Sequence, residues 1–585
     1  MSNLTVLRKG WVVVAALLLL LASFTSTSYA QSPPGTSPKT YYVSPNGSNL
    51  NPGTAEQPWA TPAFGARQLQ PGDTLIIRSG TYILRDFGED VIVPPSGRAD
   101  AWITIKGEEG DRPVLVGTDN LMAAINLSGA SYVRIENLEI TSDQQHPFRE
   151  GINAWEPAAH IILDNLYIHH LDEMGIDLRD IDDLQLLNSR IEYCGFGAVG
   201  GPTGEQGGWR NILIRGCRLS YSGHYYQGVI DNPNNPYDRP DGFGIEPSDG
   251  PVEIADTIVE HNRGDGLDSK ADNTYIHNCI VANNSCDGIK VWGSNSKIEN
   301  CLIYGTGDGD AAPTPWAGLV IDQVETPGAY FEIVNTTVHD NPQRTGYPMY
   351  VQYDSTTPIT LVMRNSIVSG GEGVVYIGDA VNFTAEHNIF YRPGQSVQVH
   401  ANGRDYAAEQ IEAGELGPGN ISRDPLFVSP AWGTEGDYHL QAGSPAIDSG
   451  TATGAPTIDL EYRSRPAGEG YDIGAYEFSS RDEEPLIWEP KTISDKYKAW
   501  TIRFNMPVDA STITGQNITV TDASSNQVDV IVEPGSDGRS AIVTPVKAYP
   551  AGQVYYLNIG KGIKSTSGKF LKRPVIMQFT ISEST

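Results

Sequence analysis

The sequence predicts an all-β protein in which a right-handed parallel β-helix, a solenoid, is followed by a small β-sandwich domain of the Ig-like type. Three observations support this prediction: a short phrase recurs along the chain, its closest copies are evenly spaced, and no helical hydrophobic period accompanies it. A unit as short as this spacing allows cannot bury its own apolar face, whereas stacked units share one continuous core. The chain of 585 residues is also too long for one ordinary core.

The recurring phrase has the form apolar-X-Asn-X-X-apolar, as in IENLEI around Asn137. Asp256, Asn278 and Asn300 occupy its central slot at equal intervals, and longer gaps elsewhere indicate loop insertions. Each unit is expected to be a β-branched strand, a polar turn and a second strand. The Asn amides in the turns are expected to hydrogen-bond along the stack.

Residues 1–30 are expected to be a secretory signal peptide. Arg8 and Lys9 precede a short apolar run at 12–21, and small residues follow before position 31. The run is short for a bilayer span. Residues 31–39 then form a linker, and the sequence predicts a secreted protein, extracellular or at the cell surface, with no membrane span after signal removal.

Residues 40–478 are expected to form the β-helix with N- and C-terminal caps, which cover its open edges. Residues 479–484 are a polar linker, and residues 485–582 contain alternating strands such as WTIRF and VYYLNI, as a β-sandwich does. The run RFNMPVDASTITGQNITVTD resembles bacterial Ig-like modules. That resemblance implies a spacer or attachment role, with association to the cell surface or cell wall through this domain.

The formal net charge of −31 limits the classes of partner. Residues 481–585 are close to neutral, so the acid lies in residues 31–480. This excess argues against a nucleic-acid partner and is consistent with clustered carboxylates that bind a cation. Five cysteines without zinc spacing indicate buried thiols, not a disulfide framework or a zinc site.

A second repeated phrase supplies the candidate site. Its three copies are GFGIEPS (242–248), GDGLDSK (264–270) and CDGIKVW (286–292). Aligned on their first residues, they predict a vertical row of Glu246, Asp268 and Lys290, because equivalent residues of stacked coils lie about 4.8 Å apart.

The same alignment predicts a second row of Phe243, Asp265 and Asp287. Strand alternation places Leu267 and Ile289 toward the core, so the charged side chains are expected to need no burial.

Stacked carboxylates repel one another, and a cation relieves the repulsion. Ca²⁺ takes six to eight oxygen ligands. The predicted ligands are Asp241, Asp265 and Asp268, with Glu246 or Asp287 as further ligands. A lysine beside the cation has its pKa lowered, which suits a base near neutral pH. These parts fit β-elimination on a uronic acid polymer, with Lys290 removing the C5 proton.

This segment resembles the pectate lyases of polysaccharide lyase family nine. The matching motifs are DGF (241–243), GDGLD (264–268) and GIKVWG (288–293). The resemblance implies a calcium-dependent carbon–oxygen lyase that degrades an acidic polysaccharide, pectate above all. It also implies calcium ligands at Asp241, Asp265 and Asp268 and a catalytic base at Lys290. Gly264 stands where the family pattern has an Asp, so one expected ligand is missing.

Four further residues are candidates for substrate binding. Arg239 and Arg263 are expected to clamp substrate carboxylates bidentately. Lys270 adds a further cation near the site, and Trp292, two residues past Lys290, is expected to stack on a sugar ring.

Three alternatives remain open from the sequence. A polygalacturonase-type hydrolase would use paired carboxylates on the same scaffold, but no Gly-His-Gly follows the Asp motifs. A uronate C5-epimerase is similar at FGIEPSD, although Phe243 and Ser248 replace its Tyr and His. A non-catalytic, surface glycan-binding β-helix would use its carboxylates only to hold the fold.

Overall fold

The computed structural model describes residues 37–582 apart from 111, 203, 228–239, 308–316, 342–345, 354, 479–484 and 524–525. The predicted signal peptide and the 479–484 linker lie outside the described residues, as does most of the 31–39 linker. Within the described ranges the helices are short: α1 (Pro62–Arg67), α2 (Phe87–Asp90), α3 (Ala408–Glu412) and a 3-10 turn (Ala510–Thr512). None of these helices has the length and apolar character needed to cross a membrane.

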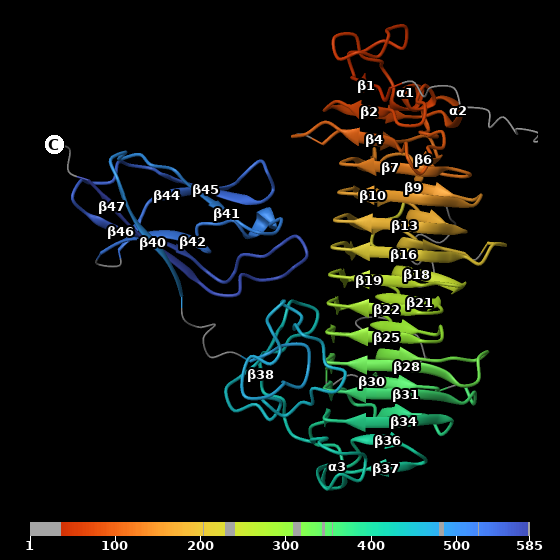
Figure 1. Ribbon diagram of the computed structural model, residues 1–585, viewed down its shortest axis with the longest axis vertical. Coiled ribbons are helices and arrows are strands. Elements are labelled where there is room, and N and C mark those ends of the chain that lie inside the picture. The colour runs from red at the N-terminus through yellow and green to blue at the C-terminus, as the bar shows by residue number, and fades with distance from the viewer. Residues whose placement is uncertain are drawn as a thin grey trace, which may run out of the picture. The chain divides into compact units, whose positions relative to one another are not determined.

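Three long sheets, A, B and C, run the length of the β-helix, and each full coil adds one strand to each in turn (Figure 1). Sheet A contains β1 (Thr40–Val43), β2 (Thr74–Ile77), β4 (Ile103–Gly107), β7 (Ser131–Glu136), β10 (Ala158–Asp164), β13 (Ile181–Leu187), β16 (Trp209–Arg215), β19 (Val252–Ala255), β22 (Thr274–His277), β25 (Ser296–Glu299), β28 (Ala329–Val334), β31 (Ile359–Arg364) and β34 (Val381–Glu386). Sheet B contains β3 (Thr81–Leu84), β5 (Val114–Gly117), β8 (Glu139–Ser142), β11 (Tyr167–Leu171), β14 (Arg190–Cys194), β17 (Arg218–Ser220), β20 (Ile258–Glu260), β23 (Ile280–Ala282), β26 (Leu302–Tyr304), β29 (Thr337–Asp340), β32 (Ile367–Gly370) and β35 (Ile389–Tyr391).

Sheet C carries the candidate site. It contains β6 (Leu121–Asn126), β9 (Phe148–Ala154), β12 (Met174–Leu178), β15 (Gly197–Gly201), β18 (Asp241–Ser248), β21 (Leu267–Ala271), β24 (Ile289–Val291), β27 (Ala317–Ile321), β30 (Tyr347–Val351), β33 (Val375–Ile377), β36 (Val399–Ala401) and β37 (Arg404–Tyr406). Its neighbouring strands pair in parallel, and only the last strand, β37, runs antiparallel among those described.

Aliphatic and aromatic side chains stack inside the coils. In sheet C the inward row runs through Phe243, Leu267, Ile289, Leu319 and Met349, each paired with the next and each fully buried. The predicted inward orientation of Leu267 and Ile289 is therefore confirmed. The shared row also explains why so short a repeating unit is stable only in a stack.

The recurring Asn of the first phrase lies in the turn between sheets A and B. Asn278 and Asn300 have φ values of 54° and 51°, the left-handed conformation that Asn tolerates better than most residues. The predicted amide ladder is only partial. Asn165 Nδ2 donates to Asn137 Oδ1 at 3.1 Å, whereas Asn300 Nδ2 donates to the backbone oxygen of Ile458 at 2.7 Å. The requirement for the left-handed turn thus accounts for the repeat more fully than the ladder does.

The residues after the coils form a hairpin segment and the predicted sandwich. The hairpin of β38 (Phe427–Ser429) and β39 (Asp437–Leu440) belongs to a segment that lies against the side of the coils, where Tyr438 packs beside Tyr304 and Asn278 Nδ2 donates to the backbone oxygen of Asp459. The predicted C-terminal cap, which would cover the open end of the stack, does not describe these contacts. One sandwich sheet contains β40 (Leu486–Ile493), β47 (Val575–Ile581), β46 (Val554–Ile559), β42 (Ile518–Asp522) and β43 (Gln527–Val528), and the other β41 (Trp500–Arg503), β45 (Ser540–Pro545) and β44 (Val530–Pro534). The predicted β-sandwich is confirmed.

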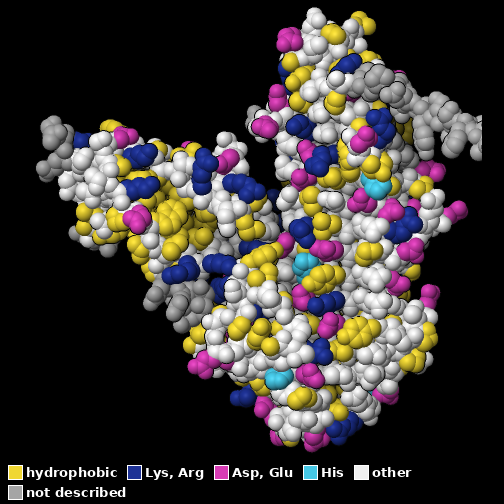
Figure 2. Space-filling view, viewed as in Figure 1, with side chains coloured by type: hydrophobic (Ala, Val, Ile, Leu, Met, Phe, Trp, Pro, Cys, Tyr) yellow, Lys and Arg dark blue, Asp and Glu magenta, His cyan; other side chains and the backbone are white. Residues whose placement is uncertain are grey.

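The polar surface and the cysteines also agree with the sequence. Figure 2 shows Asp and Glu side chains along the visible length of the β-helix, interspersed with Lys and Arg. All five cysteines are buried and none of them forms a disulfide, as expected for thiols that pack as small apolar groups.

Candidate active site

Three neighbouring strands of sheet C present the candidate residues in a register that differs from the predicted one. Phe243 pairs with Leu267, and Gly244 pairs with Asp268, which in turn pairs with Lys290. The predicted row of Glu246, Asp268 and Lys290 is therefore wrong, because Gly244 takes the place of Glu246. The matching phrases are DGFG (241–244), DGLD (265–268) and DGIK (287–290), each starting at Asp-Gly. Alignment on the first glycine thus shifted the first copy by two positions.

The second predicted row is corrected in the same way. Phe243 belongs to the buried inward row, and Asp241 takes its predicted place beside Asp265 and Asp287. The regular pairing of Gly244 with Asp268 leaves Glu246 two residues further along β18, outside the column.

The glycine after each Asp is needed for close packing at the entry to sheet C. A Cβ at Gly242 would lie 2.3 Å from Val259 Cγ1, and one at Gly266 would lie 2.4 Å from Val281 Cγ1. Such contacts are too short for any side chain. The Asp-Gly pair thus sets where each strand enters the sheet and holds the Asp at its edge.

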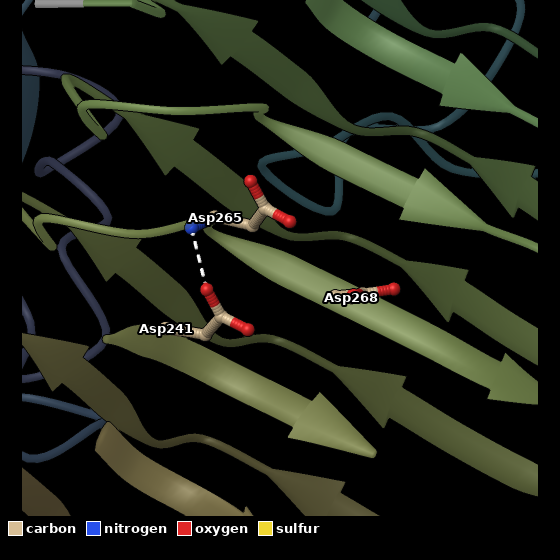
Figure 3. Close-up of side chains that lie close together, drawn as sticks. All are labelled: Asp241, Asp265 and Asp268. Carbon is tan, nitrogen blue, oxygen red and sulfur yellow. Dashed lines mark hydrogen bonds between the residues drawn. The ribbon is translucent and has the colours of Figure 1, made fainter. Parts of the chain in front are cut away.

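Each Asp of this column is bonded to the following coil. The backbone N–H of Asp265 donates to Asp241 Oδ1 at 2.7 Å (Figure 3), and that of Asp287 donates to Asp265 Oδ1 at 2.9 Å. The N–H of Ala317 continues the series, donating to Asp287 Oδ1 at 2.8 Å. One oxygen of each carboxylate therefore fixes the neighbouring coil, and the second oxygen is left for other contacts.

Three carboxylates converge into a group that fits a hard cation. One oxygen from each of Asp241, Asp265 and Asp268 lies within 4.8 Å of the others. Asp265 and Asp268 are each only 5% exposed, so the expectation that they need no burial is wrong. The buried Oδ1 of Asp268 has no hydrogen-bond partner among the described residues. An all-oxygen donor set with an unsatisfied oxygen is suited to Ca²⁺.

Lys290 lies against this group. Its Nζ is 3.0 Å from Asp265 Oδ2 and 3.1 Å from Asp268 Oδ2. Burial alone lowers the pKa of Lys290, but the carboxylates of Asp268, Asp265 and Asp287 outweigh burial and raise it. The low pKa that a base needs therefore depends on added positive charge among these carboxylates.

Two of the three carboxylates, those of Asp241 and Asp268, are held at raised pKa values. Burial raises the pKa of Asp241 well above its usual range, and the charges of Asp265 and Asp268 add to the effect. Burial also raises the pKa of Asp268, although Lys290 opposes it. The three groups cannot all carry charge cheaply without a compensating cation.

Two further ligand candidates lie outside the converging group. Glu246 has a side chain that is 54% exposed, and its Oε1 pairs with Lys270 Nζ at 3.0 Å. Asp287 is buried one coil further on, and burial and the charge of Asp265 raise its pKa well above normal. The structure therefore brings together Asp241, Asp265 and Asp268 without these two.

The structure places three of the four predicted substrate-binding residues. Lys270 lies beside the site, with its Nζ 3.4 Å from Asp268 Oδ2. The Lys270 and Lys290 ammonium groups lie 5.4 and 5.6 Å from the centroid of the Trp292 ring. Arg263 is exposed. Burial lowers the pKa of His224, and the charge of nearby Arg263 lowers it further. Arg239 lies outside the described residues.

The outward row of Asp268 and Lys290 continues into residues that the sequence analysis missed. Lys290 pairs with Val320, Val320 with Tyr350, and Tyr350 with Tyr376. Alignment of the segment YPMY (347–350) with DGLD would have identified Tyr350 as part of this row.

Three family models match the chain. Residues 41–194 match "Pel9A-like, right handed beta helix region", residues 210–409 match "Right handed beta helix region", and residues 491–581 match "Bacterial Ig-like domain". The chain is a right-handed parallel β-helix followed by a bacterial Ig-like domain. The predicted fold class is confirmed by these matches and by the sheets described above.

Comparison with individual proteins adds two solved structures and one curated sequence. The crystal structure of pectate lyase Pel9A has 18% identity and a TM-score of 0.45, over 76% of this chain and 97% of that chain. The complex structure of XylC with xylose has 12% identity and a TM-score of 0.50, over 75% of this chain and 98% of that chain. The uncharacterized protein YwoF of Bacillus subtilis (strain 168) is 40% identical over 76 residues, 13% of this chain. The chain spans only 15% of that relative's length.

Proposed function

We propose that this protein is a secreted polysaccharide lyase that cleaves a uronic acid polymer, pectate first among the candidates, by calcium-assisted β-elimination with Lys290 as the base. One observation carries the proposal: the Lys290 amine lies 3.0–3.1 Å from the two buried carboxylates of a three-Asp group with an unsatisfied oxygen. A base beside an oxygen-rich cation site is the arrangement that abstraction of a proton next to a carboxylate requires.

Asp241, Asp265 and Asp268 would hold the cation. When bound there, Ca²⁺ would neutralise the substrate carboxylate and offset the aspartate charges that raise the pKa of Lys290. The aspartates need little rearrangement for this role, because their backbone contacts to neighbouring coils already fix two of them.

Lys290 would perform the proton transfer. Its neutral amine takes the proton from C5 of the uronate, the C5–H electron pair forms the C4–C5 double bond, and the bond from C4 to the glycosidic oxygen breaks. The leaving oxygen takes a proton from water, and the resulting hydroxide takes the proton that Lys290 holds. The polymer thus becomes two chains, one with a new reducing end and one with an unsaturated uronate at its non-reducing end. Lys270 adds positive charge beside the substrate carboxylate, and Trp292 packs near both amines.

The rest of the chain is assigned roles around this reaction. Residues 40–478 carry the catalytic β-helix, and residues 485–582 act as a spacer or an attachment module at the cell surface. Secretion is proposed from the charged and apolar pattern of residues 1–30. An extracellular location is also where a polymer too large to enter a cell is encountered.

The test is a polygalacturonate assay that follows both ultraviolet absorbance of the unsaturated product and the appearance of reducing ends. Wild type is compared with Lys290→Ala, each with Ca²⁺ and with excess EDTA. An absorbance increase that requires Ca²⁺ and is lost in the variant is expected. Reducing ends without absorbance would establish hydrolysis, and no change on any uronate polymer would favour the binding-module alternative.

A further inference from the structure

A cluster of tyrosines lies on the same face of sheet C as the proposed active site. The outward row that begins at Asp268 and Lys290 continues as Val320, Tyr350 and Tyr376 in the following coils. At about 4.8 Å per coil, Tyr350 and Tyr376 lie about 10 and 14 Å along the row from Lys290. One straight row therefore joins the charged group to the aromatic one.

The rings form a continuous patch. The ring centroid of Tyr353 lies 5.6 Å from that of Tyr350 and 5.4 Å from that of Tyr376, at interplanar angles of 54° and 62°. Tyr347 adjoins the patch, 5.8 Å from Tyr353. Edge and tilted contacts of this kind leave ring faces available to a further flat partner.

The patch lies on the outside of the coil. Tyr353 is 40% exposed, and Tyr350 and Tyr376 are half-buried. The alternate residues Met349 and Val375 are fully buried, so the core of these coils is filled without the tyrosines. Packing of the β-helix therefore does not account for the aromatic patch.

We propose that Tyr350, Tyr353 and Tyr376 form a carbohydrate subsite that stacks on consecutive sugar rings of the polymer whose scissile bond lies at Lys290. This inference rests on the proposed function and adds a direction: the polymer lies along the β-helix axis. A ring of a linear polymer advances by about one strand spacing, so rings placed over Val320, Tyr350 and Tyr376 stay in step with the coils.

The chemistry of the patch matches this occupant. The C–H faces of a pyranose are apolar, and tyrosine offers a flat apolar ring with a hydroxyl that can bond to sugar oxygens. Beyond Tyr376, His400 is stacked on its ring at 5.2 Å and paired with Asp405 at 2.7 Å. The Asp405 carboxylate would repel a uronate there, so the subsite ends near Tyr376.

The test measures binding as a function of oligomer length in a Lys290→Ala background, where cleavage is blocked. Galacturonate oligomers from the dimer to the octamer are titrated by calorimetry into that protein and into versions carrying Tyr353→Ala or Tyr376→Ala. Each tyrosine substitution is expected to weaken binding of the longer oligomers about tenfold. Binding of the galacturonate dimer and of Ca²⁺ is expected to stay unchanged. Tyr330→Ala is the matched control, because Tyr330 is 39% exposed on sheet A.

Three outcomes would decide between the proposals. Equal binding of long oligomers by the tyrosine variants and their parent overturns the subsite, even if wild type is a lyase. Affinity that does not rise with length, for galacturonate and then for mannuronate and guluronate oligomers, also overturns it. Tyrosine-dependent binding without unsaturated product from wild type supports the subsite and refutes the lyase proposal.

Discussion

Replacing the proposed base should tighten calcium binding while it abolishes activity. In the described structure Lys290 neutralises the same carboxylates that a cation would neutralise, since its Nζ lies 3.0 Å from Asp265 and 3.1 Å from Asp268. Lys290→Met keeps most of the side-chain volume and removes the charge. Asp265 then loses its ammonium partner, and Asp268 keeps only the longer pair with Lys270 at 3.4 Å. This loss costs about 3 kcal/mol of unfolding free energy in EDTA, the lower end for a broken buried pair.

With Ca²⁺ bound, most of that cost disappears. What remains is the contact of the ammonium with the Trp292 ring, worth about 1 kcal/mol. The difference of about 2 kcal/mol must appear as tighter Ca²⁺ binding, about 30-fold in Kd, because the two effects close one thermodynamic cycle. Calorimetric titration of wild type and Lys290→Met with Ca²⁺ measures it directly, and turnover of polygalacturonate should fall at least about 100-fold.

The matched control for this experiment is Lys297→Met. Lys297 also pairs with a carboxylate, Glu299, at 2.6 Å and also lies over an aromatic ring, that of Tyr275, but on sheet A. The Ca²⁺ affinity of the Lys297→Met variant should equal that of wild type. Equal or weaker Ca²⁺ binding by Lys290→Met would refute the reasoning, because lysine and cation would then not compete for the same oxygens.

Three further predictions concern the ligands, the core and pH. Asp268→Asn should weaken Ca²⁺ binding about 100-fold or more by calorimetry, since even changes behind a metal ligand typically cost about 10–100-fold. Leu267→Ala should lower the unfolding free energy by about 2–5 kcal/mol, seen as a lower Tm in scanning calorimetry, whereas Leu50→Ala, at a 97% exposed site, should leave it nearly unchanged. Burial raises the pKa of Glu150 to about 8, so the stability that its protonated form contributes is lost as pH rises from about 4.5 through about 8. The Tm of Glu150→Gln should therefore rise relative to the Tm of wild type between pH 5 and pH 9. A Tm difference between the two proteins that does not change with pH would contradict this.

The architecture could be predicted because its signals are local and repeated. The Asn of each turn marks a left-handed residue such as Asn278, and alternation alone placed Leu267 and Ile289 inside. The motifs DGF and GDGLD likewise pointed to Asp241 and Asp265, and in the structure the glycine that follows each of them packs at a distance that no side chain tolerates.

The register and the depth of the site could not be obtained in this way. Glu246 was misplaced because aligning the phrases on their first residues put β18 two positions out of register. A two-residue shift keeps each side chain on the same face of the strand, so the alternation pattern could not reveal it. Asp268 is buried between Lys270 on its own strand and Lys290 from the next coil, and that second contact cannot be read from its own segment. Tyr350 was overlooked because an aromatic residue on a strand is as often part of a core as of a surface.

The carboxylates of Asp241 and Asp265 each have two roles, carried by two different atoms. One oxygen belongs to the solenoid, since it accepts the N–H of the next coil, and the other faces the site. Asparagine could keep the first bond and lose the negative charge, whereas alanine would lose both. The spacing between these side chains is thus set by the rise of the coil itself, so the charge presented at this surface can change one residue at a time while the spacing of the charged positions stays the same.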